Sequence, residues 1–256
     1  MNNALSELHS WSKESNLALN PDKTKSMLFS TRQMFTRRNL SSFPLLLSVG
    51  GKDLERVKNT KLLGVHLNEN ILWDENVKNL ASSCYTTLAS LRKIKHFTPY
   101  KLRKHLAESL ILSRLDYCDI VMFPLPQHLL KRLQRIQFAA ASFVTGRYLA
   151  WLPVRERRHW HLLKTAHKAL YSHNWPQTLR LEKVKHTHCN STVNLVVPRV
   201  SNTFQDTAAR IFNTLPSGTK SCVDSKSFSK QAFTFLKSRL SKFASVLIPN
   251  ALYYNY

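Results

Sequence analysis

Basic side chains dominate the middle of the sequence. Between residues 78 and 135, eleven lysines and arginines accompany only three acids. Fixed on helices, such cations form arrays that bind the phosphates of a polyanion, and nucleic acid is the commonest partner of this kind. The whole chain has 38 Lys+Arg against 15 Asp+Glu, a formal net charge of +23, which favours polyanion binding over a merely solvated surface. Acidic membranes are the less favoured partner. The candidate nucleic-acid-binding cations are Arg92, Lys93, Lys95, Lys101, Arg103, Lys104, Lys131, Arg132 and Arg135.

Carboxylates are too sparse to predict a metal-dependent catalyst. A two-metal polymerase or nuclease needs several acids that converge on the ions. The close acidic pairs are Asp53/Glu55, Asp74/Glu75 and Asp116/Asp119. The first pair is typical of a strand edge and the second of a helix N-terminus, whereas helix capping or a salt bridge to Arg114 explains the third. We therefore expect no metal site and no cofactor in this chain.

Histidines and cysteines also lack the spacing of a metal site. Consecutive helical residues turn by about 100°, so His159 and His161 point about 200° apart and do not share a helix face. We interpret these and the later histidines as surface and interface residues: His159, His161, His167, His173, His186 and His188, the last two beside Cys189. The cysteines are predicted to be reduced and mostly buried thiols: Cys84, Cys118, Cys189 and Cys222. No phosphate-binding loop, dinucleotide fingerprint or nucleophile elbow is present.

The pattern of apolar residues predicts an α+β chain, with a small sheet followed by a mainly helical part. In the first part we expect a helix at 2–17, strands at 25–30 and 62–67, a hairpin at 45–57 that turns at Gly50-Gly51, and a loop at TRQMFTRRN. In the second part we expect a long helix from 76 that ends before Pro99, a helix with Leu102, Leu106, Leu110 and Ile111 on one face, helices at 127–145, 154–174, 203–213 and 227–241, a short strand from Val193, and a loop at 217–230. Gly146 is placed to end the helix at 127–145. The expected domains are 1–70, 76–175 and 176–256. Neither a signal peptide nor a membrane-spanning segment is expected, which predicts an intracellular protein.

Five motifs resemble one family in the order in which that family carries them. They are LALNPDKTKSMLFS, NTKLLGVHLNENILWDENVKNL, SLILSRLDYCDIVMF, LPQHLLKRLQRIQFAAASFVTG and VNLVVPRVSNTFQDTAARIFNTLP. The family comprises the reverse transcriptases of non-LTR (LINE-type) retrotransposons, in the jockey-like and related groups, and the similarity covers the region that follows their catalytic core.

The resemblance implies a role for each part of the chain. LNPDKTK resembles motif D of the polymerase palm, whose lysine is thought to help protonate the pyrophosphate leaving group, and Lys23 holds that position. TKLLGVHL resembles motif E, the primer-grip hairpin, with Leu63, Gly64 and Val65 at its centre. The helices from about 76 to 145 resemble the thumb, which follows the template–primer duplex through its backbone. The resemblance therefore implies an RNA·DNA or RNA template–primer duplex as partner, in the nucleus or in a cytoplasmic ribonucleoprotein.

The catalytic aspartates of that family have no counterpart here. The complete polymerase holds two Mg²⁺ ions with aspartates of motifs A and C, and this chain corresponds to the region downstream of both. We expect a non-catalytic fragment, from a truncated or decayed element or from an internal start, that works as an enzyme only if another chain supplies the N-terminal polymerase portion. The palm-like strands would then keep an exposed edge and an uncovered apolar face. The alternatives are a stand-alone basic helical protein that binds RNA or ribonucleoprotein particles, and an inert product that folds poorly.

Overall fold

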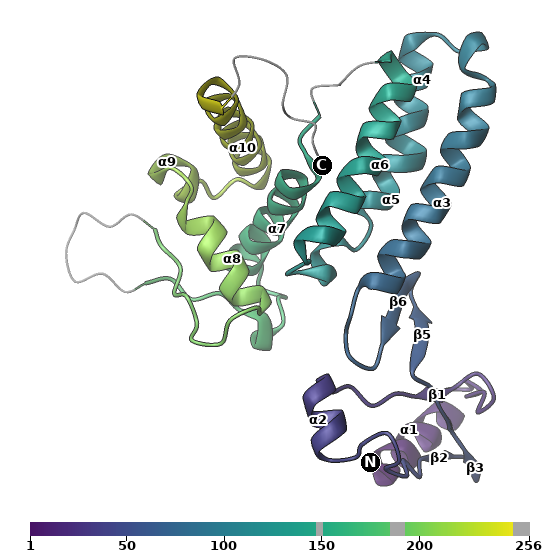
Figure 1. The fold of residues 1–256 in the computed structure, drawn as a ribbon. Coiled ribbons are helices and arrows are strands. Elements are labelled where there is room, and N and C mark those ends of the chain that lie inside the picture. The colour runs from purple at the N-terminus through teal and green to yellow at the C-terminus, as the bar shows by residue number, and fades with distance from the viewer. Residues whose placement is uncertain (147–150, 185–192, 248–256) are drawn as a thin grey trace. The chain divides into compact units, whose positions relative to one another are not determined.

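The computed structural model describes residues 1–146, 151–184 and 193–247 of the 256-residue chain. Its residues form two compact units, Met1–Asn76 and Val77–Tyr256. The first unit combines short strands with two helices, and the second consists mainly of helices (Figure 1). The chain is therefore α+β, as the sequence predicts. The division into three domains stays a prediction.

The strands of the first unit form three separate two-stranded pieces. β1 pairs in parallel with β4, whereas β2 with β3 and β5 with β6 are antiparallel hairpins. The elements in chain order are α1 (Asn2–Glu14), β1 (Lys25–Ser26), α2 (Arg32–Arg37), β2 (Ser48–Val49), β3 (Lys52–Asp53), β4 (Glu55–Arg56), β5 (Asn59–Leu62) and β6 (Val65–Asn68). Strands of two to four residues leave most of their edges unpaired, so this unit is held together by few ladder hydrogen bonds.

The glycine hairpin is confirmed, but two other predictions for this unit are wrong. Gly50 and Gly51 have φ values of +59° and +81°, which suit the tight turn between β2 and β3. The predicted single strand at 62–67 is instead the β5–β6 hairpin, in which Leu63 and Gly64 form the turn with φ values of +46° and +85°. The predicted loop TRQMFTRRN contains α2, because the Thr31 side chain accepts a hydrogen bond from the Met34 backbone N–H and caps that helix.

The predicted helix at 2–17 and strand at 25–30 are both shorter in the structure. The helix ends at Glu14 and the strand covers only Lys25–Ser26. Large apolar side chains also stay exposed, among them Phe29, Phe43 and Leu46 at 48%, 53% and 75%. A short strand that buries little apolar surface gains little from packing, which explains why regular structure stops early.

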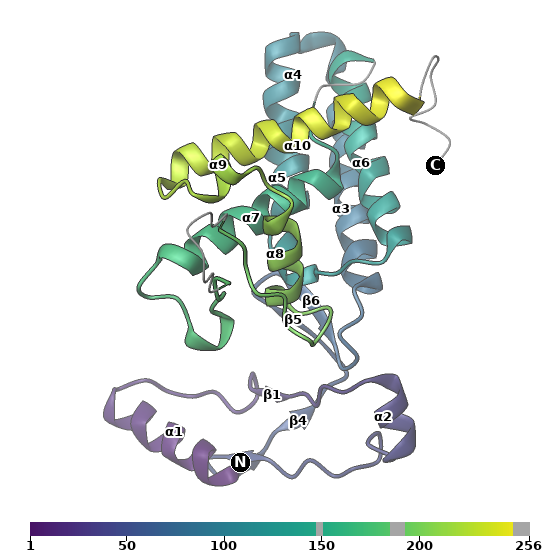
Figure 2. The same ribbon diagram turned by 90° about the vertical axis from the view of Figure 1, so that its left-hand side faces the viewer.

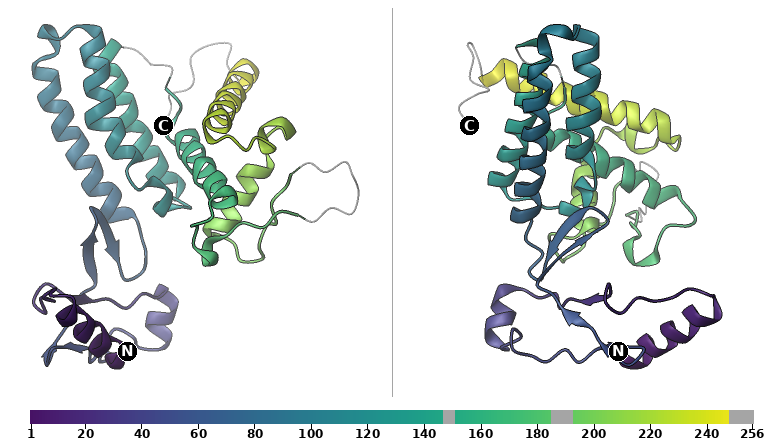
Figure 3. Two further views of the ribbon diagram at one scale, coloured as in Figure 1. Left: turned by 180° about the vertical axis from the view of Figure 1, so that it is seen from behind. Right: turned by 90° about the vertical axis from the view of Figure 1, so that its right-hand side faces the viewer.

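The second unit begins with an up-and-down arrangement of helices (Figures 1 and 3). The first of these helices rises to a turn, a broken second helix descends from that turn, and α6 rises beside it. The elements are α3 (Asp74–Lys93), η1 (Lys95–Phe97), α4 (Tyr100–Ala107), η2 (Glu108–Leu112), α5 (Ser113–Asp116), η3 (Asp119–Met122) and α6 (Gln127–Thr145). The long helix before Pro99 and the helix at 127–145 are confirmed. Gly146 has a φ of +72° and caps α6, as its position predicts.

A π-helical segment overturns the face predicted for the second helix. The backbone of η2 has more residues per turn than an α-helix. The side chains that follow η2 are therefore rotated about the helix axis relative to those that precede it. Leu110 lies within η2 and is 36% exposed, whereas Ile111 and Leu112 beside it are buried. Leu102 is 43% exposed in α4, before this segment begins. The regular spacing that grouped the leucines assumed 3.6 residues per turn throughout.

Helices α7, α8 and α10 surround an apolar core of this unit. Helix α10 lies alongside α7, with α8 against the same helix (Figure 2). The elements are α7 (Val154–Tyr171), η4 (Gln177–Leu179), α8 (Phe204–Asn213), α9 (Ser217–Lys220) and α10 (Ser225–Leu247). Leu163, Phe212 and Phe228 belong to the buried cluster between them. The predicted helices are confirmed, but the predicted loop at 217–230 contains α9 and the start of α10, and the strand from Val193 is reduced to a bridge between Lys183 and Leu195.

The cysteines are partly as predicted. Cys84, Cys118 and Cys222 are free thiols, of which only Cys84 is buried, and Cys189 lies outside the described residues. Burial raises the pKa of Cys84 to about 11, which keeps this thiol protonated. Among the described helices, none is both long and apolar enough to cross a membrane.

We predict that the first unit exchanges its backbone amides faster than the helical unit. Its paired strands are short and exposed, whereas α6 buries Leu133, Ile136 and Ala140 completely. Hydrogen exchange followed by mass spectrometry should give protection factors about 100-fold lower for residues 25–68 than for α6. Equal protection in the two regions would contradict this.

Candidate nucleic-acid interface

The structure divides the predicted basic surface into two groups. The tip group lies at the turn between α3 and α4 and comprises Arg92, Lys93, Lys95, Lys101, Arg103 and Lys104. The base group lies in the first turns of α6 and comprises Lys131, Arg132 and Arg135. Helix α6 runs toward the α3–α4 turn (Figure 3). The thirteen steps from Arg132 to Thr145 span about 20 Å at about 1.5 Å per residue. The two groups therefore lie at opposite ends of the helical bundle.

Burial of the opposite helix face holds Arg132 and Arg135 of the base group outward, whereas Lys131 is half-buried and interacts within the chain. Leu129, Leu133 and Ile136 are at most 3% exposed, and they recur at the spacing of one helix side. Arg132 and Arg135 are exposed on the other side of the same helix. Rotating α6 to hide these arginines would expose three buried apolar side chains, so their outward position is fixed by core packing.

The tip group has little internal neutralisation. Arg92, Lys93 and Lys101 are exposed. Within the described residues, Lys104 is the member of this group that forms an ion pair, through a 3.9 Å contact between its Nζ and Glu108. The sequence has no acid between Glu75 and Glu108. Positive potential consequently accumulates at this end of the bundle.

The residues that correspond to motifs D and E lie in the first unit. Lys23 is exposed in a turn that Asn20 organises, because the Asn20 Oδ1 accepts hydrogen bonds from the backbone N–H groups of Asp22 and Lys23 at 3.0 and 3.3 Å. Leu63 is 81% exposed, Gly64 is exposed and Val65 is buried. The predicted site residues are therefore divided between the two units, with Lys23 and residues 63–65 in one and every candidate cation from Arg92 to Arg135 in the other.

Asp116 forms an ion pair that the sequence did not predict. Arg157 Nε donates to Asp116 Oδ1 at 3.0 Å, and Arg157 Nη2 donates to Asp116 Oδ2. For the pair Asp116/Asp119 the sequence predicted helix capping or a salt bridge to Arg114, and the salt bridge is wrong. Arg114 instead donates from Nη1 to the hydroxyls of Ser83 and Thr87 at 2.9 and 2.8 Å, which joins α5 to α3.

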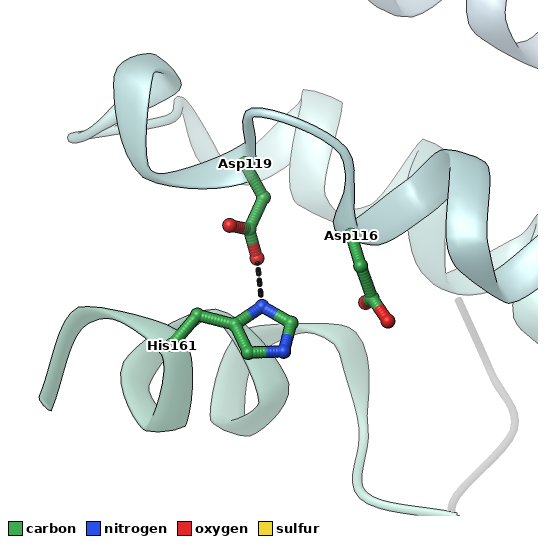
Figure 4. A group of neighbouring side chains, drawn as sticks. All are labelled: Asp116, Asp119 and His161. Atoms are coloured by element: carbon green, nitrogen blue, oxygen red, sulfur yellow. Dashed lines mark hydrogen bonds and ion pairs between the residues drawn. The ribbon is translucent and has the colours of Figure 1, made fainter. Parts of the chain in front are cut away.

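Asp119 lies beside this pair and contacts a second side chain of α7 (Figure 4). Its Oδ2 lies 2.6 Å from Nδ1 of His161, and the carboxylate is only 2% exposed. Asp119 also stabilises the cation of Arg158, which is 2% exposed and donates to the Met122 carbonyl at 2.9 Å. Burial lowers the pKa of Arg158 to about 10 even though Asp119 raises it. We call this set the α7 ion-pair cluster: Asp116, Asp119, Arg157, Arg158 and His161.

Three side chains of this cluster have the proximity of metal ligands. Asp116, Asp119 and His161 offer ligand atoms that all lie within 4.8 Å of one another. However, Arg157 contacts both oxygens of Asp116, and His161 occupies one oxygen of Asp119. A cation would have to displace these partners beside the positive charge of Arg158, so ion pairing is the better account of the cluster. The expectation of no metal site remains a prediction, which thermal unfolding with and without Zn²⁺ or Mn²⁺ can test.

The histidines are less superficial than predicted. His167 is buried, stacks on Phe228 at 4.4 Å between ring centroids, and hydrogen-bonds the Cys222 carbonyl at 3.0 Å. His161 is half-buried in the cluster, and only His173 is fully exposed among the described members of this set. His186 and His188 lie outside the described residues. The misjudged positions share helix α7, which packs against α5, η3, α6, α8 and α10, so that polar residues as well as apolar ones are buried on it.

No protein-family model matches the chain, and no curated protein or solved structure is significantly similar to it. The evidence for the candidate interface consequently comes from the geometry and charge of this chain alone.

We predict that the Asp119→Asn substitution destabilises the second unit by about 3 kcal/mol, because it leaves the buried Arg158 cation uncompensated. Urea unfolding followed by helical circular dichroism measures this change. Asp53→Asn is the matched control, because Asp53 is exposed on β3 and its loss should cost less than about 0.5 kcal/mol. A similar small effect of both substitutions would show that Asp119 contributes no net stability.

We predict that acidification destabilises the protein through His159. This imidazole is largely buried beside Arg155, Arg158 and Arg239, and burial together with these cations lowers its pKa to about 4. Between pH 6.5 and about 4 the unfolded chain binds a proton at this position that the folded chain does not, so the free energy of unfolding falls as the pH falls. From about pH 7 to about pH 4.5 the wild type should lose about 2 kcal/mol more than a His159→Gln variant in urea unfolding. Parallel pH profiles for the two proteins would contradict the assignment.

Proposed function

We propose that the helical unit binds nucleic-acid duplex through its phosphate backbone, and that this chain alone catalyses no reaction. The tip and base groups supply cations at both ends of the bundle. Backbone contacts from lysine and arginine hold a duplex without reading its sequence. RNA·DNA hybrid or RNA duplex is the proposed ligand, recognised by shape and charge.

The observation that carries this proposal is the exposed positive charge on rigid helices, above all that of Arg92, Lys93, Lys101, Arg132 and Arg135. Arg132 and Arg135 of α6 are held outward by a buried apolar face, and the cations of the tip lie in a stretch without acids. Two of the nearest carboxylates, Asp116 and Asp119, already pair with Arg157 and His161. These acids are therefore engaged inside the unit and neutralise little of the outer charge.

Within this proposal the chain corresponds to the end of the palm and the thumb of a LINE-type reverse transcriptase. The exposed Lys23 turn and the β5–β6 turn at Leu63-Gly64 are compatible with contacts to a nucleotide or a primer end. Polymerisation would need Mg²⁺ and the catalytic aspartates of a separate N-terminal portion. The partners proposed are accordingly a template–primer duplex and that portion, within a nuclear or cytoplasmic ribonucleoprotein.

The alternative function is a stand-alone protein that binds RNA or ribonucleoprotein particles. It uses the same cations, and its ligand preference distinguishes it. A thumb-like surface should prefer an RNA·DNA duplex to other polyanions, whereas the alternative predicts equal affinity for any polyanion.

We predict that replacing Lys131, Arg132 and Arg135 together by Glu weakens duplex binding at least about tenfold, and lowers the slope of log affinity against log salt by about 3. Fluorescence anisotropy with a labelled RNA·DNA hybrid measures both quantities. The matched control replaces Lys226, Lys230 and Lys237 by Glu, because these exposed residues of α10 give the same change in net charge at a different place.

Equal losses in the two triple variants would show that only net charge matters and would contradict a defined interface. Retention of both affinity and salt slope in the α6 variant would exclude the base group from binding. Incorporation of deoxynucleotides by the wild-type chain with Mg²⁺ would contradict the absence of catalysis.

A further inference from the structure

Apolar side chains are exposed together at the turn between α3 and α4. Phe97 is 87% exposed, and Tyr100, Ile94 and Leu102 are each between 43% and 47% exposed. All four lie within nine consecutive residues of one turn, which projects at the end of the bundle (Figures 1 and 3). An exposed apolar patch of this kind is typical of a binding surface, because water solvates it poorly. We call these residues the aromatic tip.

The turn is rigid despite its exposure. The Thr98 hydroxyl donates to the carbonyl of Ile94 or Lys95, each 3.1 Å away, and the Phe97 backbone N–H donates to the Ile94 carbonyl at 3.1 Å. Pro99 precedes the first turn of α4 and its carbonyl accepts from the Arg103 N–H at 3.0 Å. Phe97 therefore lies at the end of a short 3₁₀-helix whose hydrogen bonds are already formed. Binding a ligand there costs little conformational entropy, because the protein backbone at this turn is already ordered.

Cations flank the exposed rings on both sides along the chain. Arg92, Lys93 and Lys95 precede Phe97, and Lys101 follows Tyr100 by one residue. With no acid between Glu75 and Glu108, the patch complements a ligand that is anionic and also has flat apolar faces. Nucleic acid with unpaired bases combines these properties, since its bases stack on aromatic rings while its phosphates contact lysine and arginine. A stacked duplex interior offers no free base faces.

We propose that the aromatic tip binds unpaired bases of single-stranded nucleic acid, with Phe97 and Tyr100 as stacking surfaces and Arg92, Lys93, Lys95 and Lys101 as phosphate contacts. This inference rests on the proposed function in taking nucleic acid as the ligand. It adds that the tip contacts a single-stranded extension, whereas the base group contacts only backbone. The chain then distinguishes a duplex with an overhang from a blunt duplex.

Two labelled probes test this proposal: a blunt RNA·DNA duplex, and the same duplex with a single-stranded extension of about 10 nucleotides. The wild type should bind the extended probe about tenfold more tightly, since stacking contributes about 1–3 kcal/mol per base. Phe97→Ala should abolish this preference and leave affinity for the blunt duplex unchanged. Phe97→Trp should preserve the preference, because a larger ring still stacks.

Phe43→Ala is the matched control, because Phe43 is a 53% exposed phenylalanine of the first unit. The proposal is overturned if the wild type does not prefer the extended probe, or if Phe97→Ala and Phe43→Ala behave alike. It is also overturned if Phe97→Ala abolishes binding to vesicles of phosphatidylcholine and phosphatidylserine but retains the preference for the extended probe.

The same measurements separate this proposal from the duplex function. Binding of the extended probe that depends on Phe97, without any binding of the blunt duplex, would overturn the duplex function and support the aromatic tip. Binding of both probes with equal affinity would support the duplex function and overturn the tip.

Discussion

Polar and charged contacts between α7 and the α5–η3 segment connect the two halves of the helical unit. Asp116 and Asp119 pair with Arg157 and His161, while the buried Arg158 beside them reaches the Met122 carbonyl. One half is the bundle formed by α3, α4, α5 and α6, and the other is the core that α7 forms with α8 and α10. The contacts of α7 join the two halves. Buried charges are stable only when paired, so these contacts fix the position of α7 along the bundle.

This arrangement also accounts for where the surplus charge lies. The chain has 15 acids for 38 lysines and arginines, and Asp116 and Asp119 are engaged with α7. Arg92, Lys93, Lys101, Arg132 and Arg135 are left facing water, where they repel one another at moderate cost because solvent and salt screen them. A bound polyanion would relieve this repulsion, which is the physical basis of the proposed function.

The two ends of the helical bundle present two different kinds of contact surface. At the start of α6 the cations lie on a regular helix face with no exposed aromatic ring in their own turns, which suits a backbone. At the α3–α4 turn, cations flank Phe97 and Tyr100, which suits bases as well as phosphates. Because the two groups lie at opposite ends of the bundle, a ligand that reaches both is extended rather than compact.

The sequence by itself determined the elements whose signals are local. The apolar repeat of α6 and the glycine that follows it defined a helix at 127–145, and Gly50-Gly51 defined a hairpin, because both signals act within a few residues. The exposed cations of α6 followed from the same repeat. Tertiary structure alone decided the pairing of Asp116 with Arg157 across 41 residues, the π-helical shift that exposes Leu110, and the placement of the two cation groups at opposite ends of the bundle. These features depend on which side chains meet after the helices pack, and no repeat along the chain records a contact between distant helices.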